Sequence, residues 1–204
     1  DGTASRIDPR NILMHQIDRL ADIGYFPVIA CEMEFFLLSL EQDSLGRPTH
    51  TQTDRVGGRM AAGQTYGLEI MGNMSTFVHA LRDAAKVQGL PLDALIKESA
   101  PSQYEVNLQY CSNALVAADQ AVMLQRLIRG VAQSQGLLAT FMAKPFGNIA
   151  GSGFHMHCSL LDEAGNNVFS NDSSSGSPLL RKAVGGCLAS LNDCMLLFAP
   201  NLNS

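Results

Sequence analysis

Lys144-Pro-Phe-Gly-Asn-Ile-Ala-Gly-Ser-Gly-Phe-His-Met-His-Cys-Ser159 is the segment that says most about the fold of this chain. Its glycines would let the backbone approach a ligand closely, and the residues after them predict a strand over 153–161. His155, His157 and Ser159 would share one face of that strand. Two imidazoles at this spacing can begin a metal site, or give one metal ligand and one phosphate contact. Two surface histidines are the plainer interpretation.

A second segment, predicted as a strand over 27–38, carries two acids on one face. Glu32 and Glu34 are two residues apart, so both carboxylates leave the same side. Like charges this close repel each other and raise their pKa values unless a cation lies between them. An exposed edge strand would explain the pair without a cation, but the flanking residues are apolar and read as buried.

Two further acids complete a set with these residues. Glu98 precedes a predicted strand over 103–110, and Glu105 lies on it. Carboxylate oxygens with at most one imidazole per ion suit Mg²⁺ or Mn²⁺ better than Zn²⁺, and such ions commonly serve phosphoryl transfer. The glycine-rich loop is neither a P-loop nor a dinucleotide-binding loop, because both patterns require residues that are missing here.

The remaining pattern mixes helices and strands. We predict helices from Pro9 to Gly24 and over 74–88, 91–97, 114–135 and 178–198, and strands over 138–143 and 168–169. Residues 43–67 are expected to form a loop or ribbon, and 172–177 a polar linker. Because the strands carry polar residues on one face only, we expect an α+β fold with an antiparallel or mixed sheet, helices on one face and a site on the other.

Composition narrows the function classes. Hydrophobic residues make up 46% of the 204 residues, which is enough for a sizeable core, and the net charge of −5 argues against a nucleic-acid partner. Five cysteines without a C-x-x-C motif favour a reducing cytoplasm, and Cys187 and Cys194 are expected to be buried in the last helix. No apolar run is long enough for a membrane span, so no membrane association is expected.

The histidine segment resembles the ATP-region motif of glutamine synthetases. Three further stretches resemble that family in the same order: Cys31–Phe36, Glu98–Glu105 and Ala199–Ser204. The resemblance covers nearly the whole chain. It implies the α+β fold of the glutamine synthetase catalytic domain, a curved antiparallel or mixed sheet backed by helices, with 1–204 as an incomplete fragment of that domain. The family's N-terminal β-grasp domain and the later part of its catalytic domain, with substrate and phosphate arginines, would lie outside these residues.

The resemblance also implies roles for individual residues. Two divalent cations, Mg²⁺ or Mn²⁺, would be held by five side chains, with Glu34, Glu98 and Glu105 on one ion and Glu32 and His155 on the other. ATP would be contacted by His157, Ser159 and Asp93. Gly151 would contact the amino-acid substrate. The implied reaction is phosphorylation of the γ-carboxylate of glutamate, followed by attack of ammonia or an amine on the acyl phosphate.

Three positions depart from typical glutamine synthetases. Ala150 replaces Asn, Lys97 replaces His, and Ser102 stands where Gly is common. These departures resemble the branch of γ-glutamylputrescine synthetase and related γ-glutamyl-polyamine ligases, as does Gly63-Gln-Thr-Tyr66. We therefore expect an organic amine or polyamine as acceptor, with ammonia as the alternative.

The family implies a homo-oligomer of stacked rings with sites between subunits, so residues 1–204 alone are expected to be nearly inactive. Two other hypotheses remain. A non-catalytic relative would have no need for five ligating side chains, and a guanidino kinase would require clustered arginines rather than the scattered ones seen here.

Overall fold

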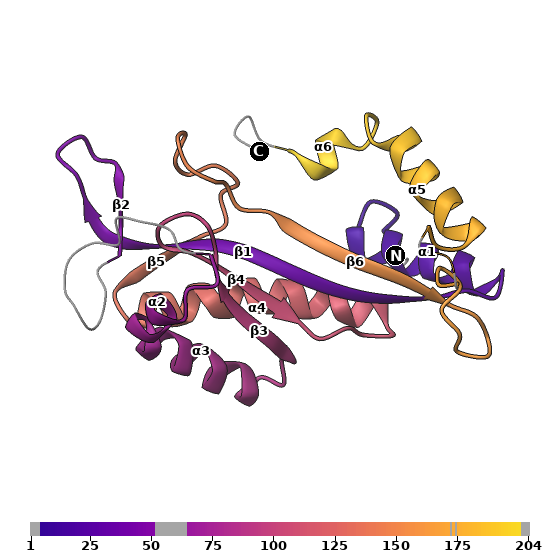
Figure 1. Ribbon diagram of the computed structural model, residues 1–204, viewed down its shortest axis with the longest axis horizontal. Helices are drawn as coiled ribbons and strands as arrows, with labels where there is room; N and C mark the ends of the chain where they lie inside the picture. Colours follow the sequence, from indigo (N-terminus) through magenta and orange to yellow (C-terminus); the bar gives the residue numbers. More distant parts are fainter. Residues whose placement is uncertain (1–4, 52–64, 172, 174, 201–204) are drawn as a thin grey trace.

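The computed structural model describes residues 5–51, 65–171, 173 and 175–200, with a six-stranded sheet backed by helices (Figure 1). The strands are β1 (Phe26–Gln42), β2 (Pro48–His50), β3 (Leu92–Lys97), β4 (Gln103–Leu108), β5 (Leu137–Thr140) and β6 (Phe154–Leu161). The helices are α1 (Pro9–Ala21), α2 (Leu68–Asn73), α3 (Ser75–Val87), α4 (Ala114–Ser134), α5 (Pro178–Ser190) and α6 (Met195–Phe198).

The long strand β1 organises the sheet. One of its edges pairs with β4 and then β2, the other pairs with β6 and then β5, and β3 extends the sheet beyond β4. Every pair is antiparallel, which decides between the antiparallel and mixed sheets that the sequence left open. Residues in the middle of β1 therefore have a neighbour on both sides.

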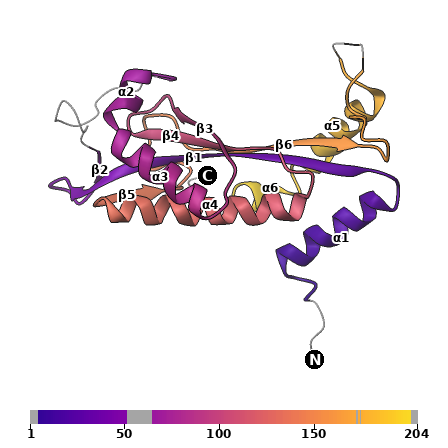
Figure 2. The same cartoon turned by 90° about the horizontal axis from the view of Figure 1, so that it is seen from below.

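The helices α3 and α4 cover one face of the sheet (Figure 2). Alternate residues of β1, including Met33, Phe35 and Leu37, point to this face and are buried. They pack against Phe77 and Leu81 of α3 and against a stripe on α4 that contains Ala117, Ala121, Leu124 and Ile128. The apolar alternation in the sequence therefore marks the core, and the acidic face of β1 lies opposite it.

Several elements begin and end where local chemistry predicts. Asp8 caps α1 by accepting a hydrogen bond from the backbone N–H of Arg10, and Pro9 follows at the first helical position. Asn113 caps α4 through two backbone N–H groups, and Gly136 ends that segment with φ +69°. The predicted ribbon is present as the end of β1 paired with β2, whereas 52–64, including Gly63 of the stretch quoted above, lie outside the described residues.

Four sequence predictions are wrong. Residues 92–97 form strand β3 rather than a helix, because antiparallel pairing with β4 satisfies their backbone groups. Residues 168–169 form a turn, next to a single bridge between Leu161 and Asn167. The last helix is interrupted over 191–194, and Cys187 on it is exposed and Cys194 only half-buried.

None of the five cysteines forms a disulfide. Within the described residues, no helix is long and apolar enough to cross a membrane.

Candidate functional site

Strand register assembles the acidic face. Glu34 of β1 pairs with Glu105 of β4, while Glu32 lies between Asn107 of β4 and His155 of β6. Directly paired residues project from the same face with their Cβ atoms about 5 Å apart. The pairing alone therefore brings three carboxylates and an imidazole together, on the side of the sheet away from α3 and α4.

The side chains converge further at one point. Glu32, Glu105 and His155 each offer one ligand atom, and these atoms lie within 4.8 Å of one another. The Nδ1 atom of His155 is 3.3 Å from one carboxylate oxygen of Glu32, and the Nε2 atom of His157 is 2.8 Å from the other. Glu32 thus contacts both histidines of the H-x-H pair.

The electrostatics of Glu105 fit a cation. Glu105 is only 7% exposed, and burial raises the pKa of its carboxyl group, as do the charges of Glu32, Glu98 and Glu34 in decreasing order. A divalent cation would offset this excess of negative charge. Oxygen ligands with a single imidazole suit Mg²⁺ or Mn²⁺, so the residues present fit the ions that the sequence predicts.

The other two predicted metal ligands lie close by but outside the group of three. Glu34 accepts hydrogen bonds at Oε2 from the Gln103 side chain (2.9 Å) and from the Gly153 backbone N–H (3.1 Å). Glu98 accepts from the backbone N–H of Ser99 at 3.2 Å. The group of three mixes residues assigned to different ions, so the division between two ions stays a prediction.

The predicted nucleotide contacts line two neighbouring depressions on this face. Asp93 and Glu32 line one, and His157 and Ser159 line the other. Ala30 and Tyr110 border both depressions, and Tyr110 is 79% exposed. The sequence interpretation missed Tyr110, although an aromatic residue at the end of a predicted strand with polar alternation was a usable signal.

The glycine-rich loop is held tightly at Gly151. A Cβ atom there would lie 2.3 Å from the carbonyl oxygen of Ala143, so only glycine fits this conformation. The loop packs through Phe146 and Ile149 on a second apolar cluster, formed by Phe36, Leu38 and Ala100 on the acidic side of the sheet. This cluster fixes the loop at one end of the acidic patch, the group of side chains formed by Glu32, Glu34, Glu105 and His155.

Lys97 and Ser102 lie under the site rather than in it. Lys97 is fully buried, and its ammonium group donates to the carbonyl oxygens of Glu98 and Ala100 and lies 5.5 Å from the Tyr104 ring. Burial lowers the pKa of Lys97 to about 8. Ser102 has φ +57°, a conformation that favours glycine. Both departures from the family pattern therefore shape the turn that carries Glu98.

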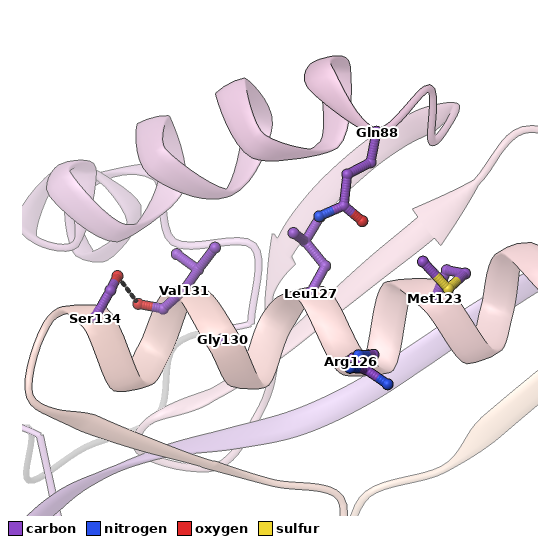
Figure 3. Close-up of a pocket in the computed structure, with 7 residues that line it drawn as sticks. All are labelled: Gln88, Met123, Arg126, Leu127, Gly130, Val131 and Ser134. Atoms are coloured by element: carbon purple, nitrogen blue, oxygen red, sulfur yellow. Dashed lines mark hydrogen bonds between the residues drawn. The ribbon is translucent and has the colours of Figure 1, made fainter.

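A separate groove lies in the helical layer (Figure 3). It is lined by Gln88 beyond the end of α3 and by Met123, Arg126, Leu127, Gly130, Val131 and Ser134 of α4. These residues include no carboxylate and no histidine, and α4 lies across the sheet from the acidic patch. We therefore assign the site to the patch and not to this groove.

Comparisons with known proteins agree with the motifs and the geometry. Residues 6–204 match the family model described as "Glutamine synthetase, catalytic domain". Over its full length the chain is 36% identical to the γ-glutamylputrescine synthetase of Escherichia coli and 32% identical to a glutamate–isopropylamine ligase of a Pseudomonas species. It spans 43% and 44% of these relatives, respectively.

A solved structure described as a novel glutamine synthase homolog has the same fold. Its TM-score is 0.84 at 28% identity, and the match covers 98% of this chain and 43% of that one. The family match, the relatives and the shared fold together show that this chain belongs to the glutamine synthetase family.

Proposed function

We propose that the chain forms the metal- and nucleotide-binding part of an ATP-dependent ligase that joins glutamate to an organic amine. The observation that carries the proposal is the convergence of Glu32, Glu105 and His155 on one sheet face, beside the depressions lined by Asp93, His157 and Ser159. The names of the two amine-ligase relatives support the choice of reaction.

The residues of the patch have separable tasks in this proposal. Mg²⁺ or Mn²⁺ would be held by Glu32, Glu105 and His155, with Glu34 and Glu98 beside them. These cations would reduce the repulsion between the negatively charged phosphate and carboxylate oxygens of the substrates. His157, Ser159 and Asp93 would bind ATP, with the exposed ring of Tyr110 as an apolar surface at the same place. Gly151 would contact the glutamate.

The proposed chemistry proceeds in two steps. A γ-carboxylate oxygen of glutamate attacks the terminal phosphorus of ATP, which forms an acyl phosphate and releases ADP. The amine nitrogen then attacks the acyl carbon, phosphate leaves, and the amine loses a proton. The family resemblance implies that assisting arginines belong to the part of the relatives that residues 1–204 do not span, so we expect residues 1–204 alone to show little or no turnover. Robust ATP-dependent γ-glutamyl transfer by them would refute that expectation.

The acceptor is expected to be an organic amine rather than ammonia. Ala150, Lys97 and Ser102 support this choice only through their likeness to amine ligases, because Lys97 is buried and Ser102 shapes a turn. Ammonia, the acceptor of a glutamine synthetase, is the alternative. We also propose a cytoplasmic homo-oligomer of stacked rings, which light scattering and electron microscopy of the full-length protein would test.

A coupled assay of ADP release tests the reaction in the full-length protein. Glutamate would be combined in turn with ammonia, putrescine, spermidine and small monoamines, in the presence of Mg²⁺ or Mn²⁺. We expect the highest kcat/KM with an organic amine and no activity in the Glu105→Gln variant. The highest value with ammonia would favour the alternative. No ADP release with any acceptor would favour a non-catalytic relative.

A further inference from the structure

The side chain of Gln103 links three parts of the site. Its Nε2 atom donates to Glu34 Oε2 at 2.9 Å and to the carbonyl oxygen of Gly151 at 2.7 Å. Its Oε1 atom accepts from the backbone N–H of Ala100 at 3.1 Å. One amide therefore joins a carboxylate of the acidic patch, the glycine-rich loop and the turn that carries Glu98.

The orientation of this amide is determined by its partners. Glu34 and the Gly151 carbonyl can only accept, whereas the Ala100 N–H can only donate, so the nitrogen must face the first two and the oxygen the third. Gln103 is 1% exposed, so water has little access to replace these bonds. An unmade hydrogen bond at a buried position is costly, and the arrangement is held as a unit.

The backbone of the same residue fixes its place in the turn. The N–H of Gln103 donates to the carbonyl of Ala100 at 3.2 Å, and its carbonyl accepts from the N–H of Glu98 at 3.0 Å. The Glu34 carboxylate also bonds the loop directly, by accepting a hydrogen bond from the Gly153 N–H at 3.1 Å. A shift of the Glu34 carboxylate would therefore pull on the loop at both Gly151 and Gly153.

We infer that Gln103 is a positioning residue that transmits cation binding near Glu34 to the loop at Gly151. The inference rests on the proposed function, in which Glu34 faces the cation and Gly151 the amino acid. Cation binding draws the Glu34 carboxylate into one position, and the amide then holds the Gly151 carbonyl in a matching position. Gln103 thus couples the metal half of the site to the substrate half without touching a reacting atom.

Hydrogen exchange in the full-length protein tests this coupling. The Gln103→Met variant keeps the side-chain length and removes all three hydrogen bonds. The Gln133→Met variant changes an exposed residue of α4 on the helical side and is the matched control. Backbone exchange over 144–153 would be measured with and without Mn²⁺, and Mn²⁺ affinity would be measured by titration calorimetry on the same samples.

We expect Mn²⁺ to slow exchange over 144–153 at least about tenfold in the wild type and in Gln133→Met. In Gln103→Met, Mn²⁺ should still bind within about tenfold of the wild-type affinity, but the slowing should be lost around Gly151, while the amide of Gly153, which bonds Glu34 directly, should keep it. In the ligase assay the KM for glutamate should rise about tenfold while the KM for ATP changes less than about threefold.

Each other outcome is decisive. Full slowing by Mn²⁺ in Gln103→Met would overturn the inference alone. No Mn²⁺ binding to the wild type would overturn the metal assignment of the proposed function, and the inference with it. If Gln103→Met does not fold, Gln103→Glu provides the same measurement, because it keeps the acceptor for Ala100 and places a carboxylate against Glu34 and the Gly151 carbonyl.

Discussion

The two strands beside the middle of β1 contribute to the site in different ways. On the β4 side, Gln103 and Glu105 are nearly fully buried. Gln103 is held by hydrogen bonds, and Glu105 is repelled by neighbouring carboxylates. On the β6 side, the side chains of His155 and His157 are 57% and 63% exposed, and each has a ring nitrogen close to a carboxylate oxygen of Glu32. The β4 side is therefore preorganised, whereas the β6 side can adapt to what it binds.

The physical origin of the contrast is packing. The strand β4 lies between β1 and β3 and over the helical layer, and buried residues surround it. Among the six strands of the described residues, β6 pairs with β1 alone, and its residues from Phe154 to Cys158 are exposed on both faces. Burial makes an unpaired charge expensive, so a cation should matter most on the β4 side.

The largest expected effect tests the buried side directly. The Glu105→Gln variant keeps the side-chain shape and removes one charge, so Mn²⁺ affinity should fall about 100-fold or more. Without metal, the same variant should be more stable than the wild type, because repulsion from Glu32, Glu98 and Glu34 is relieved. Calorimetric titration and thermal unfolding measure the two effects. Unchanged Mn²⁺ affinity would contradict the claim that a cation matters most on the buried β4 side.

The next effect concerns the glycine-rich loop at one end of the acidic patch. In Gly151→Ala the new Cβ atom would meet the Ala143 carbonyl, a backbone atom that cannot move aside easily, so the free energy of unfolding should fall by about 1–3 kcal/mol. Gly147→Ala is the matched control, because nothing lies within 4 Å of its Cβ position. Denaturant unfolding of both variants measures the difference, and equal stabilities would contradict the assigned loop packing.

A smaller effect separates the two histidines. The His155→Asn change should weaken Mn²⁺ binding about tenfold, because His155 belongs to the group of three ligand atoms. The His157→Asn change should leave Mn²⁺ binding within about threefold and weaken binding of a non-hydrolysable ATP analogue about tenfold. Calorimetry with each ligand checks both. If the two variants behave alike, the division of tasks along β6 is wrong.

The last effect is a pH dependence of stability that comes from Lys97. Its pKa is about 8 in the folded chain against 10.5 for the ordinary group, so the unfolded chain binds the extra proton between these values. The stability of the wild type relative to Lys97→Met should therefore rise as pH increases from 8 to 10.5, and stay flat below pH 7. Denaturant unfolding across this range measures it, and a falling difference would contradict the burial of the ammonium group.

Most of the fold could be predicted because the alternation of apolar and polar residues along the sequence matches the alternation of buried and exposed positions in the strands. The alternation on β1 and β4 identified both the core face and the acidic face, and Pro9 marked the start of α1. The β3 segment misled the prediction because Leu, Ala and Lys favour a helix locally, and only pairing with β4 overrides that preference. Cys187 was predicted to be buried because apolar helix residues usually face a core. The prediction failed because α5 buries none of its residues.

The candidate site was predictable in its acids and histidines but not in the residues that hold them. Glu32, Glu105 and His155 were identified from the alternation and the family resemblance, and the structure brings them together. The role of Gln103 depends on Gly151, which is 48 residues away in the sequence, and a glutamine on a polar strand face carries no special signal. The buried position of Lys97 likewise depends on the turn over 98–103.

One measurement tests the central claim most directly: an anomalous difference map from crystals of the full-length protein soaked in Mn²⁺. The account predicts a peak on the acidic face of the sheet with Glu105 and either Glu32 or His155 among its ligands. A second peak near Glu34 and Glu98 would agree with two ions. A map with no peak among these side chains, in crystals that show Mn²⁺ bound elsewhere, would contradict the account.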